Sequence, residues 1–131
     1  IVAVEDPNDT SSYVGTLSVG ETAIITSGSY QRYFIGSYGM KYHHIIDPST
    51  GRPADNDLVS VTIVCEDGTL ADALSTAMFV LGENAALKYW RENGGFEMIM
   101  INKDNEIMCT TGLIEVFTLT NRTDYTLKMV E

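Results

Sequence analysis

The pattern of hydrophobic and polar positions changes its period twice along the chain. Up to residue 65, short runs of alternating apolar and polar side chains are separated by Gly, Asn and Ser, which is typical of β-strands. The spacing becomes helical between residues 67 and 82, and alternation returns after residue 96. Strands are expected at Tyr13–Val19, Thr22–Thr26, Gln31–Ile35, Met40–Ile46, Leu58–Cys65, Phe96–Ile101, Glu106–Thr111, Ile114–Leu119 and Tyr125–Val130.

Turn-forming residues divide the first half of the chain. Ser27–Ser29 predicts a turn after the Thr22–Thr26 strand, and Gly36–Gly39 predicts a hairpin between two short strands. Residues 47–57 contain two prolines and a glycine, so they are expected to form a loop. Leu58–Cys65 is rich in β-branched residues and almost continuously apolar, which indicates a strand that is buried on both faces.

Two helices are expected in the middle of the chain. The first runs from residue 67 to a stop at Gly82, and the second spans Asn84–Glu92. The apolar residues expected on one face of the first helix are Leu70, Leu74, Ala77, Met78 and Leu81. Many strands with two mid-chain helices predict a single α+β domain over residues 1–131, built on a largely antiparallel sheet.

Composition narrows the class of protein. Hydrophobic residues make up 44% and charged residues 20% of the chain, which indicates a globular fold. The net charge of −10 argues against nucleic acid as a partner, because phosphate binding needs clustered Lys and Arg. A bound cation could still hold an anionic ligand. Cys65 and Cys109 match no metal-binding spacing and are expected to be buried, unreactive thiols.

Asp72 and Thr76 are candidate metal ligands on the first helix. They are four residues apart and therefore share one helix face. A carboxylate and a hydroxyl are hard oxygen ligands of the kind that Mg²⁺ prefers. On spacing alone, an acidic residue near a helix start is more often a solvated carboxylate that favours the helix dipole. Both interpretations stay open at this stage.

The only two histidines of the chain are adjacent, at the end of a predicted strand. Successive strand residues face opposite ways, so only one imidazole can point into a given pocket. An imidazole there could accept a proton from a hydroxyl nucleophile. From the residues alone, catalysis and structure are evenly balanced for His44. Asp47 and Thr50 could hold a phosphate–metal assembly, although Asp-Pro-Ser-Thr-Gly is also a good turn sequence without any function.

The segment from Ser27 to Tyr33 carries a weaker signal. Gly28 could allow a ligand to approach the backbone closely, and Tyr30 or Tyr33 could stack on an aromatic ring. A simple turn for Ser27 and core packing for one of the tyrosines are the alternatives.

Read in this order, the three segments resemble the ApbE family of FAD:protein FMN transferases, once described as thiamine-biosynthesis lipoproteins. The matching residues are Ser27–Tyr30, His43–Gly51 and Ala71–Thr76, and Val80–Gly82 and Thr111–Gly112 also fit. Ser29 stands where the family usually has an acid. Family members are much longer, so the resemblance implies that this chain is the carboxyl-terminal portion of an ApbE-like fold.

The resemblance implies a magnesium-dependent transfer of FMN from FAD to a Thr or Ser hydroxyl of an acceptor protein, with release of AMP. Asp72 and Thr76 then correspond to the metal ligands and His44 to the base. The residues that would line the FAD site are Ser27, Gly28, Tyr30, Asp47, Thr50 and Gly51. The alternatives are an FAD pyrophosphatase, a flavin-binding module without transfer, and a purely structural module.

The resemblance also sets expectations about context. The family is typically exported in bacteria, which implies a periplasmic or cell-surface location, with contact to a membrane only through a lipid anchor of the parent protein. The family's amino-terminal half contributes flavin contacts and a further metal ligand. We therefore expect the fragment to fold but to transfer FMN poorly or not at all.

Overall fold

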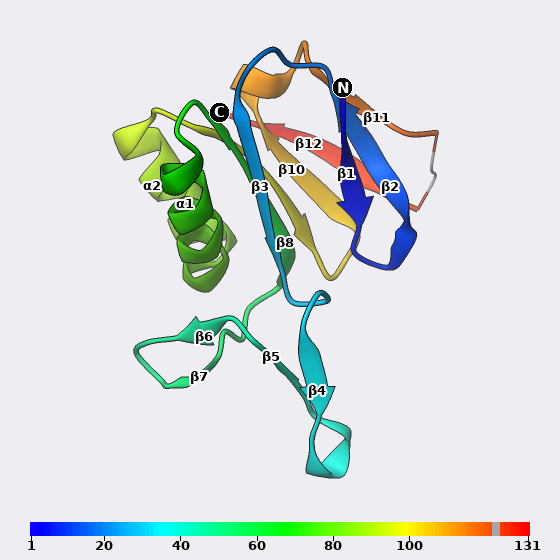
Figure 1. Cartoon of the computed structure of the whole chain (residues 1–131), viewed down its shortest axis with the longest axis vertical. Helices are drawn as coiled ribbons and strands as arrows, with labels where there is room; N and C mark the ends of the chain where they lie inside the picture. Colours follow the sequence, from blue (N-terminus) through cyan, green and yellow to red (C-terminus); the bar gives the residue numbers. More distant parts are fainter. Residues whose placement is uncertain (122–123) are drawn as a thin grey trace.

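The computed structural model describes residues 1–121 and 124–131 and shows three layers (Figure 1). The middle layer is a five-stranded sheet in the order β12-β10-β9-β8-β3. Its strands are β3 (Ala23–Gly28), β8 (Leu58–Cys65), β9 (Glu97–Asn102), β10 (Glu106–Thr110) and β12 (Thr126–Val130). All neighbours are antiparallel except β10 and β12, which are parallel.

Each face of this sheet is covered by a different layer. Helices α1 (Gly68–Leu81) and α2 (Glu83–Asn93) lie on one face (Figure 1). A three-stranded sheet lies on the other and consists of β1 (Val2–Asp6), β2 (Asp9–Leu17) and β11 (Phe117–Leu119). The sequence-based prediction of an α+β fold with two mid-chain helices is therefore confirmed.

The alternation of side chains along β9 explains the three layers. Met98 and Met100 pack in the core beneath the helices, whereas Ile99 and Ile101 pack against the three-stranded sheet. Successive strand residues point to opposite faces, so a strand covered on both sides must be apolar throughout. The neighbouring β8 follows the same rule, and the prediction that it is buried on both faces is confirmed.

Helix α1 has well-defined ends. The Asp67 carboxylate accepts hydrogen bonds from the backbone N–H groups of Thr69 (2.9 Å) and Leu70 (3.1 Å), which is an N-cap. Gly82 ends the helix at a φ of 79°, a value that favours glycine. The predicted stop at Gly82 is confirmed.

The predicted buried face of α1 is partly wrong. Leu70 and Leu81 are 46% and 48% exposed, and Ala77 is exposed as well. The residues that α1 buries are Ala71, Leu74, Ser75, Met78 and Phe79. The buried stripe is rotated toward Ser75, whose hydroxyl is hydrogen-bonded inside the fold and so can be buried without penalty. A prediction from hydrophobicity does not count a serine as buried, so it places the buried face of α1 on the wrong residues.

Residues 29–57 form an arm that projects from the edge of the sheet layers (Figure 1). Its first hairpin joins β4 (Tyr33–Ile35) to β5 (Lys41–His43) through a short 3₁₀ turn at Ser37–Gly39. Its second hairpin joins β6 (Ile46–Asp47) to β7 (Arg52–Pro53). The segment predicted as a plain loop therefore contains two short strands.

The predicted strand Met40–Ile46 is broken at His44. Ile45 turns into the core with 3% exposure, and its N–H bonds the His43 ring nitrogen Nδ1 at 3.3 Å. This local contact competes with the strand ladder and ends β5. The predicted hairpin at Gly36–Gly39 is confirmed, although β4 is shorter than expected.

Two further boundaries differ from the prediction. Ser27 and Gly28 do not form a turn, because both still pair with β8 as part of β3. The strand expected at Ile114–Leu119 is reduced to β11, since a 3₁₀ turn at Thr111–Leu113 leads into it. Within the described residues, no helix is long and apolar enough to cross a membrane.

Candidate active site

The first and third sequence motifs meet where β3 lies beneath α1. Ser27 Oγ lies 2.8 Å from Ser75 Oγ and 3.2 Å from Thr76 Oγ1. Ser75 is fully buried and Ser27 is half-buried, whereas the Thr76 side chain reaches solvent. Three hydroxyls from two elements therefore form one cluster at the surface of the helix.

The number of protons available shows which hydroxyl of the cluster donates each hydrogen bond. The Ser75 hydroxyl donates to the Asp72 carbonyl oxygen at 3.0 Å. A hydroxyl has a single proton, so Ser75 must accept from Ser27, and Ser27 in turn must accept from Thr76. The Thr76 proton is thereby committed to Ser27, and the Thr76 oxygen lone pairs are left to face outward.

Asp72 lies one helical turn before Thr76 and is exposed. Within residues 1–121 and 124–131, its carboxylate has no hydrogen bond or ion pair, and no three His, Cys, Asp or Glu side chains gather as a metal cluster. A free carboxylate beside an outward-facing hydroxyl nevertheless fits the oxygen ligands of Mg²⁺. The remaining ligands would come from water, backbone or substrate phosphate.

His43 has a structural position. Its Nδ1 accepts the N–H of Ile45, so in the neutral ring Nε2 carries the proton and donates to the Ala54 carbonyl oxygen at 2.9 Å. The ring also meets Phe79 of α1 edge-on, with 5.7 Å between the centroids. Both nitrogens are occupied, and this imidazole holds the arm against the helix.

His44 differs in each of these respects. Its side chain is exposed, and its Nδ1 lies 3.2 Å from the Arg32 carbonyl oxygen. A carbonyl can only accept, so Nδ1 carries the proton and the Nε2 lone pair is available in the neutral ring. The His44 backbone N–H bonds the same carbonyl at 3.1 Å, which fixes the position of the residue. Of the two histidines, only His44 can act as a base.

Contacts connect the three sequence motifs, but not all of the candidate site residues contact one another. Arg32, just after the first motif, holds His44, and Phe79 of α1 contacts His43. The Asn56 side-chain amide also donates to the Phe79 carbonyl oxygen at 2.8 Å, which ties the arm to the helix a second time. Among the described residues, no hydrogen bond or ion pair joins His44 to Asp72.

Gly28 makes room for a side chain of its own chain. A Cβ atom on Gly28 would lie 2.3 Å from the Tyr30 ring, so only glycine fits beneath that ring. Burial, together with the nearby Glu5 carboxylate, raises the pKa of the Tyr30 hydroxyl. The predicted role of Tyr30 in flavin stacking stays a prediction, and its observed contact is with Gly28.

The Asp47–Gly51 segment is a tight turn. The Asp47 carboxylate accepts from the N–H (2.8 Å) and hydroxyl (2.7 Å) of Ser49, and these bonds lower the pKa of Asp47. The Asp47 carbonyl accepts from the N–H groups of Thr50 and Gly51, and Gly51 has a φ of 67°. The turn geometry explains all three residues, and a role in FAD binding stays a prediction.

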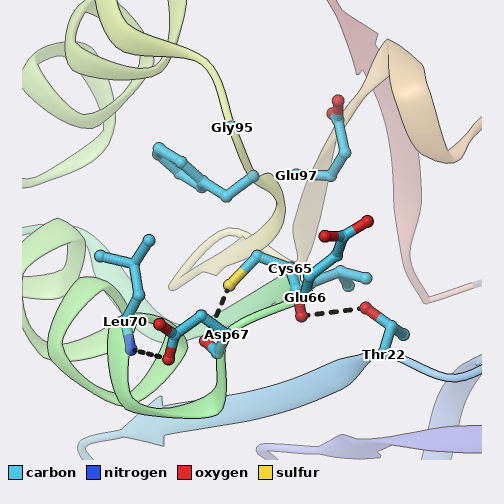
Figure 2. A pocket seen from close by; sticks show the side chains of 9 residues that line it. Thr22, Cys65, Glu66, Asp67, Leu70, Gly95 and Glu97 are labelled. Atoms are coloured by element: carbon cyan, nitrogen blue, oxygen red, sulfur yellow. Dashed lines mark hydrogen bonds between the residues drawn. The ribbon is translucent and has the colours of Figure 1, made fainter.

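Two clefts are prominent, and neither is lined by His44, Asp72 or Thr76. One has a volume of about 530 Å³ at the start of α1, where Glu66, Asp67 and Glu97 make its walls acidic (Figure 2). The other has a volume of about 800 Å³ and borders the arm, where its walls carry three basic side chains.

Sequence reasoning missed three contributors to the site: Ser75, the Arg32 carbonyl group and Phe79. Ser75 stands between Asp72 and Thr76, and its position in the predicted helix was the only available signal. The carbonyl of Arg32 acts through the backbone, so its residue type gives no signal. Phe79 was visible only as an apolar helix residue.

Solved structures with the same arrangement define the class of protein. The ApbE protein of Thermotoga maritima is 38% identical, with a TM-score of 0.74, and the match covers 88% of this chain and 37% of that one. The flavin transferase ApbE of Vibrio cholerae is 32% identical, with a TM-score of 0.64, and the match covers 95% and 36%. The fold of this chain therefore matches about a third of each of these two proteins, the second of which is a flavin transferase.

The family follows from the sequence comparison. A sequence model of the ApbE family matches residues 1–100, and this chain belongs to that family. The FAD:protein FMN transferase of Treponema pallidum is 39% identical over 115 residues, which cover 87% of this chain and 32% of the relative. The chain thus spans about a third of the length of the curated relatives that it matches.

Proposed function

We propose that this chain supplies the histidine and metal-ligand side of the active site of an FAD:protein FMN transferase. Two observations carry this proposal: the Ser27–Ser75–Thr76 hydroxyl cluster on β3 and α1, and the His44 imidazole on the arm, whose Nε2 has no hydrogen-bond partner within the described residues. Membership of the ApbE family and the names of its relatives support the same reaction.

In the proposed reaction, an acceptor Ser or Thr oxygen forms a bond to the phosphorus atom of the FMN half of FAD. The bond between that phosphorus and the bridging pyrophosphate oxygen breaks, and AMP leaves with this oxygen. The proton of the acceptor hydroxyl moves to His44 Nε2. The His44 Nδ1–H bond to the Arg32 carbonyl keeps the ring in the tautomer that this step requires.

Asp72 and Thr76 would hold Mg²⁺ in this scheme, and Ser27 keeps the Thr76 lone pairs turned outward. When bound, the ion neutralises pyrophosphate charge that builds up during transfer. Ser27, Gly28, Tyr30, Asp47, Thr50 and Gly51 would lie along the FAD site. The chain itself contributes a fixed acid–base group and a pair of oxygen ligands.

A second candidate is an FAD pyrophosphatase, in which water replaces the acceptor hydroxyl. The exposure of His44 favours it, because the free Nε2 of this chain is open to solvent. The same residues would serve, and the products would be free FMN and AMP. Comparing products with and without acceptor protein separates the two reactions.

The deciding experiment uses this chain and a chimera in which it replaces the matching segment of the Treponema pallidum relative. Each is incubated with FAD, Mg²⁺ and a Thr-bearing acceptor, and covalent flavin and AMP are measured. We expect transfer by the chimera, its loss in His44→Ala with FAD binding retained, and little transfer by the 131-residue chain alone. Equal transfer by the chimera and its His44→Ala variant would overturn the proposal.

The location of the protein is a separate proposal. Family resemblance supports export to the bacterial periplasm or cell surface, with a lipid anchor on the parent protein as the means of membrane attachment. Fractionation of cells that produce the native gene product, with detection by an antibody against this chain, tests it. Recovery in the cytoplasm would contradict it.

A further inference from the structure

The 800 Å³ cleft runs along one strand of the arm and is called the β5 groove here. Lys41, Tyr42 and His43, the whole of β5, line it. Arg52 of β7 and Lys103 of the β9–β10 turn line it as well. Successive strand residues face opposite ways, and a cleft that follows the edge of the strand accounts for all three of them lining it.

The backbone pairing shows which edge of β5 is free. Bonds from the Gly36 N–H to the Met40 carbonyl and from the His44 N–H to the Arg32 carbonyl mark the hydrogen-bonded pairs of the hairpin. In an antiparallel pair these alternate with non-hydrogen-bonded positions, so the backbone groups of Lys41 and His43 point away from β4. Within the described residues, β5 has β4 as its only strand partner.

The charge of the groove is opposite to that of the chain. Asp and Glu outnumber Lys and Arg by 18 to 8 over the whole sequence. The charged residues that line the groove are Lys41, Arg52, Lys103 and a single acid, Asp55, and the Lys41 ammonium lies 4.2 Å from the centroid of the Tyr33 ring. Such a local reversal of sign favours an anionic partner and repels a cationic one.

We propose that the β5 groove receives an extended acidic segment of the acceptor protein, which pairs with the free edge of β5. Main-chain hydrogen bonds to Lys41 and His43 would give the affinity, and the three basic side chains would select for carboxylates. The inference rests on the proposed function, because it takes the acceptor to be a protein. His44 follows directly after β5, so a strand added here passes beside the proposed base.

Other features of the arm agree with a protein rather than a phosphate as the ligand. The groove shares no residue with the Ser27–Ser75–Thr76 cluster, where the pyrophosphate is proposed to bind. Phe34 and Tyr38 at the tip of the arm are 66% and 101% exposed and offer apolar contacts beyond the groove, and Met40, which lines the groove, is 58% exposed. A small anion needs neither a strand edge nor an apolar tip.

The test uses the 131-residue chain and a fluorescein-labelled octapeptide in which Asp alternates with Thr. Fluorescence anisotropy should show saturable binding. A peptide with Lys in place of Asp should bind at least tenfold more weakly, and so should an Asp peptide whose alternate amides are N-methylated. Absence of binding, or equal binding of the Asp and Lys peptides, would overturn the proposal.

Substitutions at charged residues test whether the peptide binds in the β5 groove. Arg52→Glu and Lys103→Glu should each weaken the Asp peptide about tenfold, whereas Lys88→Glu, on the exposed side of α2, should leave it unchanged. Arg52→Gln and circular dichroism spectra control for misfolding. Equal effects of the three charge-reversing substitutions on peptide binding would contradict the proposal. Displacement of the peptide by a stoichiometric amount of inorganic pyrophosphate would also contradict it. Peptide binding is measured without FAD, so its failure is distinguishable from failure of FMN transfer.

Discussion

Ser27 Oγ lies 3.2 Å from Thr76 Oγ1, although 49 residues separate them in the sequence. The contact exists because α1 packs across β3 and places its exposed Thr76 above the end of that strand. It joins two motifs that sequence reasoning could only place in order along the chain. It also commits the Thr76 proton and so turns an ordinary helix hydroxyl into an available oxygen ligand.

If Asp72 and Thr76 hold Mg²⁺ as proposed, loss of this contact should weaken magnesium binding. In Ser27→Ala the Thr76 hydroxyl can rotate, and we expect Mg²⁺ affinity to fall about tenfold, the usual cost of losing a group that orients a ligand. Asp72→Asn should remove the Mg²⁺-dependent rise in melting temperature entirely. Calorimetry with a MgCl₂ titration measures both. Thr26→Ala, which breaks the neighbouring 2.8 Å contact to Thr62, is the matched control and should keep the response.

The two histidines should respond oppositely to substitution. His43→Ala loses two hydrogen bonds and the Phe79 contact, and we expect it to cost about 1–3 kcal/mol of unfolding free energy. His44→Ala, at an exposed position, should change the stability of the chain by about 0.5 kcal/mol or less but abolish FMN transfer by the chimera. Urea denaturation and FMN-transfer assays distinguish the two. Greater destabilisation by His44→Ala than by His43→Ala would refute the structural assignment.

Gly28→Ala should destabilise the fold through its clash with Tyr30. The new Cβ would lie 2.3 Å from the ring, and overpacking of this kind costs about 1–3 kcal/mol. In a Tyr30→Ala background the clash is absent, so the same glycine substitution should cost much less. A double-mutant cycle by denaturant unfolding measures the coupling, expected at about 1 kcal/mol or more. Additive effects would show that the ring does not hold this position.

Cys109 should make stability fall at high pH. Burial, and then the Glu97 carboxylate, raises its thiol pKa from 9.0 to about 12 in the folded state. The unfolded chain loses this proton from about pH 9 upward while the folded chain keeps it. The contribution is therefore complete below pH 9 and is lost progressively as pH rises toward 12. The difference in unfolding free energy between the natural chain and Cys109→Ala, measured at pH 8 and 10.5, should shrink.

The α1 cap gives a simpler stability test. Asp67→Ala removes the acceptor for two backbone N–H groups and should cost about 1 kcal/mol, whereas Asp67→Asn should keep most of that stability. Thermal unfolding of the two variants provides the comparison. Equal losses in both would mean that the charge at the helix start, rather than the cap, supplies the stabilisation.

The sequence predicted the α+β class, both helices and most of the strands because their signals are local. The apolar run of β8, the helical spacing of α1 and the stop at Gly82 each depend on residues close together in the chain. The α+β class followed from the order of these elements. Predicted strand boundaries were wrong where a side chain replaced a strand partner in a backbone hydrogen bond. At Ile45, the backbone N–H bonds the His43 ring instead of continuing the strand.

The candidate site could be predicted only in part. Residue types and spacing alone left catalysis and structure evenly balanced for His44, and the resemblance to the ApbE family assigned the expected roles of His44, Asp72 and Thr76. The decision depends on which ring nitrogen meets a carbonyl and which meets an N–H, and these partners come from the folded backbone. The buried serine of the hydroxyl cluster was missed for a related reason, because its partner lies on a distant strand.

Phe79 of α1 makes two contacts with the arm. Its ring meets His43 and its carbonyl holds the Asn56 amide, while the candidate base lies on the arm and the candidate ligands lie on α1. The position of the candidate base relative to the candidate ligands therefore depends on this aromatic contact as well as on the sheet that carries both elements. Under the proposed function, a smaller side chain at Phe79 would lower the rate of transfer without removing any group that takes part in the reaction.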